Sequence, residues 1–539
     1  NHYLGDPGYL PKDIERYNRA TLADLKRVAE QKLGANQSVV VFGVPGNKVL
    51  EDAARTKADE EQESKETSTV ANTMPDEPWR ASQPQAGSLS HLELPVPSSF
   101  KLDNGLTVML VEQHKLPVVS ARVVVLSGSD TNPIDRPGLA SFTADLLTEG
   151  TNRRSSSQIA DDGAEIGAAV RTASSGDLSA VAIRTLKQNV DAALDLLSDV
   201  ALNPKFDPAE IDRVRNRRQG RLLQLHDQPF QLAFGAFLKT VFGAQHPYGY
   251  RELGTPESNR AISREEMVQF WQHGYTPGNS ALVLTGDLNQ EEARQLAQKY
   301  FGNWKGIANK HTPPPVEVNT SRAVFIVDKP GAPQTFVLVG SLGVPRSTPD
   351  YVPLEVMNNA LGGLFSSRLN LNLREEHGYT YGSFSFFAYR RGPGLFAAGG
   401  AIRTDATAPA VQETFKELER IRTAPLTADE LKLAKGAFAL SLAGLFETSE
   451  QTAATAGELF TYDLPLDYYQ KLSPQIDAVT AEDVQRVANK YVNPDSSIVI
   501  AAGDRAKIEP ELKKLSLGPV EARDFEGNPV KEAATSGQQ

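Results

Sequence analysis

The chain contains no cysteine in its 539 residues. This absence excludes disulfide bonds and thiolate chemistry without identifying a compartment. The sequence also has no run of 18 consecutive apolar residues, so it holds no candidate for a membrane-spanning helix. Blocks of basic residues are missing too, and the formal net charge is -11. These features argue against nucleic acid or an anionic membrane as a partner.

The chain repeats itself at a long interval. Residues 263–287 align without gaps with residues 480–504, at an offset of 217. Both segments begin with Ser or Thr as a helix N-cap, continue through acids in the first turn, and close with a proline turn and an apolar strand. At the other end of the unit, residues 108–126 align with residues 324–342 at an offset of 216. This period is too long for a solenoid, so it indicates tandem duplication of a domain.

The duplication sets the domain organisation. We expect one complete domain over residues 93–307 and a second over residues 321–514, joined by a proline-rich linker at residues 308–320 and followed by a tail at residues 515–539. Each domain opens with two strands before its first helix. This order predicts an α+β fold with antiparallel or mixed sheets, rather than a doubly wound parallel sheet.

A third, partial copy stands near the start of the chain. Residues 21–44 match the closing helix and strand of the two full copies. We therefore expect residues 1–47 to be the end of a further domain, because a helix and one strand cannot bury a core alone. The sequence starts at Asn1 with neither an initiator methionine nor a signal peptide, so we expect the beginning of that domain upstream. Residues 48–92 are acidic and rich in Pro, Ser and Gln, which predicts a linker.

Three motifs carry a resemblance to a known family. Residues 138–151 read GLASFTADLLTEGT, residues 246–267 read HPYGYRELGTPESNRAISREEM, and residues 361–385 read LGGLFSSRLNLNLREEHGYTYGSFS. In this order they resemble motifs of the M16 metallopeptidases, the family of pitrilysin, insulinase and the mitochondrial processing peptidase. The resemblance covers nearly all of the chain. It implies two tandem M16-type domains that form one half of a clamshell, whose chamber admits unfolded peptides.

The first motif departs from the family at each position with metal chemistry. The family pattern is close to G-x-A-H-F-L-E-H, in which two histidines on one helix face hold zinc and the glutamate activates a water. This chain has Ser141, Ala144 and Asp145 there, and a count of 76 from Asp145 to the family's third ligand reaches Arg221. Serine is a poor zinc ligand, alanine takes no proton, and a guanidinium has no lone pair to offer. We therefore expect no zinc in this chain, and an ion pair between Asp145 and Arg221 in its place.

The same helix also has a simpler interpretation. Its apolar residues have the spacing of an ordinary amphipathic helix with a core-facing stripe, formed by Leu139, Phe142, Leu146 and Leu147. In that interpretation Ser141 and Asp145 are polar residues of the outer face. The two interpretations are compatible, since neither gives the site any chemistry.

Arg374 and Tyr381 are the residues to which the resemblance gives a role. In the family, the zinc-free half of the clamshell supplies an arginine and a tyrosine, seven residues apart, to peptide at the zinc site, and these two residues match that spacing. Arg374 would offer permanently charged donors to a peptide carbonyl, and Tyr381 a phenolic donor to the oxygen that gains charge. From the residues alone, the default interpretation makes Arg374 an ordinary surface arginine and Tyr381 a core residue of an aromatic strand.

Together these features predict the non-catalytic half of an M16 zinc endopeptidase. We expect it to bind no cofactor, to complete a peptide chamber, and to act with a zinc-bearing half that is either part of the same precursor or a separate chain. An M16-like structural subunit without proteolytic role, as in respiratory complexes, is the alternative. A partner that also lacked H-x-x-E-H would favour that alternative. The sequence resembles bacterial members, for which we expect a periplasmic or secreted location.

Overall fold

The computed structural model describes residues 2–42, 78–81, 93–308, 311–317 and 321–530. The chain divides into two compact units, Asn1–Gly87 and Ser88–Gln539. Both sheets of the fold, and all residues predicted to form sites, belong to the second unit.

The described residues of the first unit form the helices α1 (Leu10–Arg19) and α2 (Leu22–Lys32). α2 begins with a capping box, in which the side chains of Thr21 and Asp24 each accept from the backbone N–H of the other residue. This start agrees with the repeat. Neither helix buries a residue.

The closing strand expected within residues 21–44 is not formed in residues 39–42, which are 69–89% exposed. A strand is stable only beside a partner that pairs its backbone groups, and the described part of this unit offers none. The predicted linker at residues 48–92 lies outside the described residues, except for the short helix η3 (Pro78–Ala81).

The first sheet of the second unit has the strand order β1-β2-β6-β3-β5-β4. β2 and β6 run parallel, and the other neighbours are antiparallel. The strands are β1 (Ser98–Lys101), β2 (Thr107–Glu112), β3 (Val118–Val125), β4 (Arg171–Ser174), β5 (Ser179–Leu186) and β6 (Ser280–Gly286).

The second sheet repeats this arrangement in the order β12-β7-β11-β8-β10-β9. β7 runs parallel to β11 and β12, and the remaining pairs are antiparallel. Strands β7, β11, β8, β10 and β9 correspond in order to β2, β6, β3, β5 and β4, so the mixed α+β duplication is confirmed. The strands are β7 (Ala323–Asp328), β8 (Gln334–Leu342), β9 (Thr380–Ala388), β10 (Leu395–Arg403), β11 (Ile498–Gly503) and β12 (Val520–Arg523).

Helices cover the sheets. Those of the first repeat are α4 (Leu139–Leu146), α5 (Ser156–Glu165), α6 (Val190–Leu202), α7 (Pro208–Leu225), α8 (Pro229–Phe242), α9 (Pro256–Ala261), α10 (Arg264–Gly274) and α11 (Gln290–Phe301). Those of the second repeat are α12 (Tyr351–Asn358), α13 (Arg368–Asn370), α14 (Thr407–Thr423), α15 (Ala428–Gly444), α16 (Ser449–Thr461), α17 (Leu472–Ala478), α18 (Ala481–Tyr491) and α19 (Arg505–Lys514). None of the described helices is long and apolar enough to cross a membrane.

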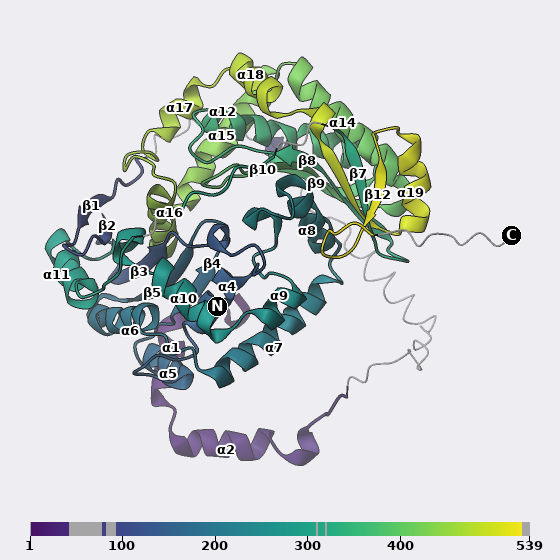
Figure 1. Cartoon of the computed structure of the whole chain (residues 1–539). Helices are drawn as coiled ribbons and strands as arrows, with labels where there is room; N and C mark the ends of the chain where they lie inside the picture. The colour runs from purple at the N-terminus through teal and green to yellow at the C-terminus, as the bar shows by residue number, and fades with distance from the viewer. Residues whose placement is uncertain (1, 43–77, 82–92, 309–310, 318–320, 531–539) are drawn as a thin grey trace. The chain divides into compact units, whose positions relative to one another are not determined.

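The two repeats exchange one helix each. α8 belongs to the first repeat by sequence but packs on β8 and β11 of the second sheet, while α16 of the second repeat packs on β3 and β6 of the first (Figure 1). The contact of α16 is close, because a Cβ added at Gly457 would lie 3.1 Å from Cγ2 of Val124. Each sheet therefore obtains part of its cover from the other repeat. The sequence predicts two consecutive domains and gives no indication of this exchange.

The segment after Lys514 corrects a second expectation. Residues 515–539 were expected to form a tail, but β12 within them pairs in parallel with β7 and forms the edge of the second sheet. Phe525 then stacks on His226 of the first repeat, with 3.3 Å between ring centroids. A four-residue edge strand lacks the long apolar alternation by which strands are recognised, so the sequence does not reveal it.

Candidate functional site

The helix α4 places the three degenerate metal positions. Its N-cap is Gly138, with φ of 91°, where a Cβ would come within 2.7 Å of the carbonyl oxygen of Leu253. Only glycine fits this approach without strain. The predicted core stripe is confirmed, since each of its four residues is at most 3% exposed: Leu139, Phe142, Leu146 and Leu147. Ala144 is buried as well, so Ser141 and Asp145 are the polar groups that α4 presents on its other face.

A buried arginine from α7 occupies the space beside these residues. Arg218 is 1% exposed, and its Nη1 donates to Oδ2 of Asp145 over 2.5 Å. Its Nη2 donates to Oγ of Ser141 over 2.9 Å and to the carbonyl oxygen of Leu253 over 3.0 Å. Its Nε donates to Oδ1 of Asn259 over 2.7 Å. All three nitrogens of the guanidinium are therefore satisfied, as burial of a charge requires.

This arginine is not the one that the sequence predicts. Asp145 does form an ion pair, but with Arg218 rather than with Arg221, which lies one helical turn further along α7. Residues three apart share a helix face, so a count along the sequence cannot distinguish them. Burial lowers the pKa of Arg218, and the neighbouring Asp145 opposes that effect. The guanidinium keeps its charge, because its ordinary pKa lies far above neutrality.

The residues of this site do not fit a zinc ion. The one carboxylate on α4, Asp145, is already paired with a cation, and the position of the family's catalytic glutamate is held by Ala144, which has no polar side-chain atom. In the described part of the chain, no group of three or more His, Asp or Glu side chains is arranged to hold a metal. A cavity of about 600 Å³ remains beside the site, lined by Ser141, Asp145, Arg218, Arg221 and the edge strand β4 among others.

Tyr381 lies on an exposed bulge of β9, the edge strand of the second sheet. Thr380 pairs with Ile402 and Ser383 with Gly400, so that two residues of β9 face one of β10. Such a bulge turns a side chain away from the regular direction of the sheet. Tyr381 is 90% exposed, and its interpretation as a core residue is therefore wrong.

Arg374 lies in η9 (Leu371–Glu376), a short π-helix before β9. Its guanidinium stands 4.4 Å from the ring centroid of Phe365 and 2.8 Å from Oε1 of Glu375. The exposed aromatic ring supports the cation from one side and restricts its position. No hydrogen bond or ion pair within the described ranges joins Arg374 or Tyr381 to the Asp145 cluster.

The sequence matches two profiles of one peptidase family. The profile described as Insulinase (Peptidase family M16) matches residues 107–250, and the profile described as Peptidase M16 inactive domain matches residues 261–438. Together they cover more than half of the chain.

The chain belongs to peptidase family M16.

Individual relatives agree with this membership. The zinc protease YmxG of Bacillus subtilis is 24% identical over 393 residues, which cover 72% of this chain and 93% of that protein. The beta subunit of the mitochondrial-processing peptidase of Lentinula edodes is 26% identical over 416 residues, with 72% and 86% covered. A solved M16 inactive domain from Pseudomonas fluorescens has a TM-score of 0.72 at 25% identity, covering 76% of this chain and 98% of that one.

A second polar cluster of this M16 chain joins the two repeats, and the sequence did not reveal it. The phenol of Tyr248, in the second motif, donates to Asp177 in the turn between β4 and β5, and the backbone N–H of Arg391 donates to the other carboxylate oxygen over 3.0 Å. Asp130 lies 3.6 Å from the Arg391 guanidinium. Burial raises the pKa of Asp130 to about 7 and also raises the pKa of Asp177. The aspartates are isolated in the sequence, so no pattern predicts their meeting.

Proposed function

We propose that this chain is the non-catalytic half of an M16 zinc endopeptidase. It completes a peptide chamber and supplies Arg374 and Tyr381 to peptide bound at the zinc site of a partner half. Zinc belongs to that partner in this proposal, and this chain binds none.

The observation that carries the proposal is the contrast between the two candidate sites. At the degenerate metal site, Arg218 is buried in an ion pair with Asp145, so the polar groups there bind each other and stabilise the fold. At the second site, a phenol that is 90% exposed stands on a bulged edge strand, after an arginine held on an aromatic ring. Tyr381 is exposed on its bulge and Arg374 is partly exposed, so a substrate carbonyl could accept from both.

A partner half follows from the same reasoning. Donors to a developing oxyanion accelerate hydrolysis only beside a nucleophile, and among the described residues no group of His, Asp or Glu side chains is arranged to hold the metal that would activate a water. One relative is by name a subunit of a processing peptidase, which supports an arrangement in more than one chain.

The test begins with the protein that co-purifies with this chain. We expect that protein to contain H-x-x-E-H and about one zinc ion, and we expect cleavage of a fluorogenic peptide when the two are combined but not by this chain alone. A stably bound partner without H-x-x-E-H, or a complex without peptidase activity, would support the scaffold alternative instead.

A further inference from the structure

A second cavity lies on the face of the first sheet that α16 covers in part. It has a volume of about 940 Å³ and is bordered by β3, β5, β4, the turn after α5 and the first turn of α16. This size is within the range of ordinary ligand sites. The cavity is separate from the Asp145 cluster, since none of the residues of that cluster lines it.

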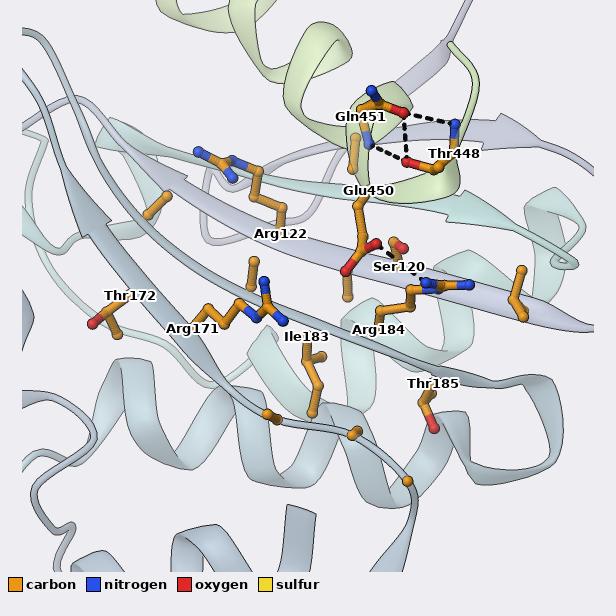
Figure 2. Close-up of a pocket in the computed structure, with 18 of the residues that line it drawn as sticks. Ser120, Arg122, Arg171, Thr172, Ile183, Arg184, Thr185, Thr448, Glu450 and Gln451 are labelled. Carbon is orange, nitrogen blue, oxygen red and sulfur yellow. Dashed lines mark hydrogen bonds and ion pairs between the residues drawn. The ribbon is translucent and has the colours of Figure 1, made fainter. Parts of the chain in front are cut away.

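The charged side chains that line this cleft are three arginines and one glutamate: Arg122, Arg171, Arg184 and Glu450. Figure 2 shows the three guanidinium groups on neighbouring strands, with Glu450 beside Arg184. Arg184 and Glu450 form an ion pair of 3.3 Å between half-exposed groups. Within the described ranges, neither Arg122 nor Arg171 has such a carboxylate partner. The cleft is therefore basic on a chain whose formal net charge is -11.

Strand register fixes the spacing of these cations. Arg122 of β3 and Arg171 of β4 both lie opposite Ala182 of the intervening β5, so two strand spacings of about 4.8 Å separate them. Arg184 lies two residues along β5 from Ala182, a distance of about 7 Å. One small anion cannot reach all three groups at once. The arrangement suits a ligand with several anionic groups.

The floor of the cleft consists of small residues. Ser120, Ala173, Ala180 and Ala182 share this face of the sheet with the arginines, and their short side chains leave the depth of the cleft open. The arginines stand around this floor (Figure 2). Burial lowers the pKa of Arg122, and the charge of Glu458 nearby partly opposes this effect. Burial has therefore removed part of the water around this guanidinium, and a carboxylate that bound there would stabilise its charge in place of that water.

We propose that this cleft binds an extended acidic peptide segment whose carboxylates lie on alternate residues. Side chains two residues apart in an extended chain project to the same side, so carboxylates on alternate residues all face the cleft, about 7 Å from each other. The strand register places the backbone positions of the three arginines about 8–10 Å apart, and the long side chains of arginine and glutamate span the difference. Arginine pairs with carboxylates through two parallel hydrogen bonds. Nucleic acid is disfavoured because no aromatic residue lines the cleft for base stacking and because the whole chain is acidic.

The proposal is independent of any partner half, because all residues of the cleft belong to this chain. It is tested on the isolated full chain by fluorescence anisotropy with a labelled peptide, Gly-Glu-Ala-Glu-Ala-Glu-Gly, capped at both ends. The comparison peptides replace each Glu by Gln, or place the three Glu residues in a row. We expect the alternating peptide to bind at least tenfold more tightly than the Gln peptide, and more tightly than the contiguous one. Its binding should weaken as salt rises from about 50 to about 300 mM.

Variants assign the binding to the cleft. The double variant Arg122→Gln with Arg171→Gln should weaken binding of the alternating peptide at least tenfold. The matched control, Arg260→Gln with Arg403→Gln, removes the same charge from exposed positions outside the cleft and should change binding less than twofold. Ala182→Phe keeps every charge but covers the floor, and it should also abolish binding, so the test survives if the double variant misfolds. Equal binding of the Gln peptide, equal loss in the control, or tighter binding of a dT oligonucleotide would each overturn the proposal.

Discussion

The carboxylate of Asp145 and the guanidinium of Arg218 form a partly buried ion pair of 2.5 Å, with the arginine side chain 1% exposed and the aspartate 29% exposed. The pair lies where relatives with an H-x-x-E-H motif would carry their second histidine. At this position the guanidinium of Arg218, rather than a metal ion, is the cation beside the carboxylate of Asp145. The hydrogen bonds of Arg218 to Ser141, Leu253 and Asn259 connect α7 with α4, with α9 and with the segment before α9.

Removing this arginine should be costly. We expect Arg218→Met to lower the free energy of unfolding by about 3–5 kcal/mol, because Asp145 and the oxygens of Asn259 and Leu253 lose their donor. Arg217→Met is the matched control, since its guanidinium is half-exposed and Glu149 keeps Arg213 as a second partner, so the loss should cost at most about 1 kcal/mol. Urea denaturation of both variants measures the difference. Equal midpoints would show that the buried pair does not stabilise the fold.

Restoring the two histidines should not restore the metal. We expect the native chain, and the variant with Ser141→His and Asp145→His, to contain far less than one zinc per chain by elemental analysis. In the variant, Arg218 would place a positive charge beside the ion and repel it. A stoichiometric zinc content in the native chain would contradict the assignment of this half as metal-free.

Arg374 and Tyr381 should affect turnover and leave assembly unchanged. In the complex with a zinc-bearing half, Arg374→Ala or Tyr381→Phe should reduce kcat/KM by on the order of a hundredfold, the usual effect of losing one donor to a developing charge. Arg403→Ala is the control, as its exposed guanidinium pairs with Asp405. Zinc content and complex size are measured in parallel. Full activity of both variants would remove the pair from catalysis.

The buried Asp130 should make stability depend on pH. Its pKa in the folded state, about 7, is higher than its ordinary value of 3.8, so the folded chain holds a proton that the unfolded chain has released. The stability due to this group is complete below about pH 4 and is lost as pH rises towards 7, by up to about 4 kcal/mol. Three other titratable or charged groups face Asp130: Asp177, Arg391 and His311. They are unchanged in the native chain and in the Asp130 variant, so their own titration cancels in the comparison.

The check is chemical denaturation of the native chain and of Asp130→Asn at pH values from 5 to 8. The native chain should lose stability relative to the variant as pH rises, and the difference should level off above pH 7. Parallel curves for the two proteins would show that Asp130 does not hold the proton.

Gly457 tests the exchange of helices. Gly457→Leu should destabilise the protein by about 1–3 kcal/mol, because the new side chain overpacks against Val124 of the other repeat. Gly436→Leu, at a helical glycine with nothing within 4 Å of an added Cβ, should be neutral or stabilising. The fluorescence of Trp271 and Trp304 measures unfolding of the first repeat. Gly457 belongs to the second repeat, so a change in this signal shows that the two repeats are coupled. A change seen by circular dichroism but not by this fluorescence would mean that the repeats unfold separately.

Local rules explain which parts of the fold the sequence predicts. The helix starts at Thr21, Ser263 and Thr480 all have the capping boxes that their sequences indicate, because the bonds involved span three residues. The repeat offsets also predict which strands correspond, since they align β2, β3 and β6 with β7, β8 and β11. Both features depend on residues close together in the chain or on direct alignment of its copies.

Features that depend on three-dimensional placement were not predictable in the same way. The partner of Asp145 depends on the rotation of α7, which decides between Arg218 and Arg221 although both lie on one face. The exposure of Tyr381 depends on a bulge in the pairing of two strands, at which the hydroxyl of Thr380 donates to the carbonyl of Ala401 on β10. The basic cleft depends on the register of three strands, and no single segment contains its pattern.

The exchange of helices also delays completion of the first repeat during synthesis. All six strands of the first sheet have been made once Gly286 is added, but α16, which packs on β3 and β6, begins at Ser449. Ribosomes add about 5–20 residues per second, so on the order of ten seconds pass before that face can be covered. During this interval the nascent sheet presents apolar side chains such as Val124 and Val283 without their final neighbours. We therefore expect a chaperone that binds exposed β-sheet to bind this protein mainly during that interval.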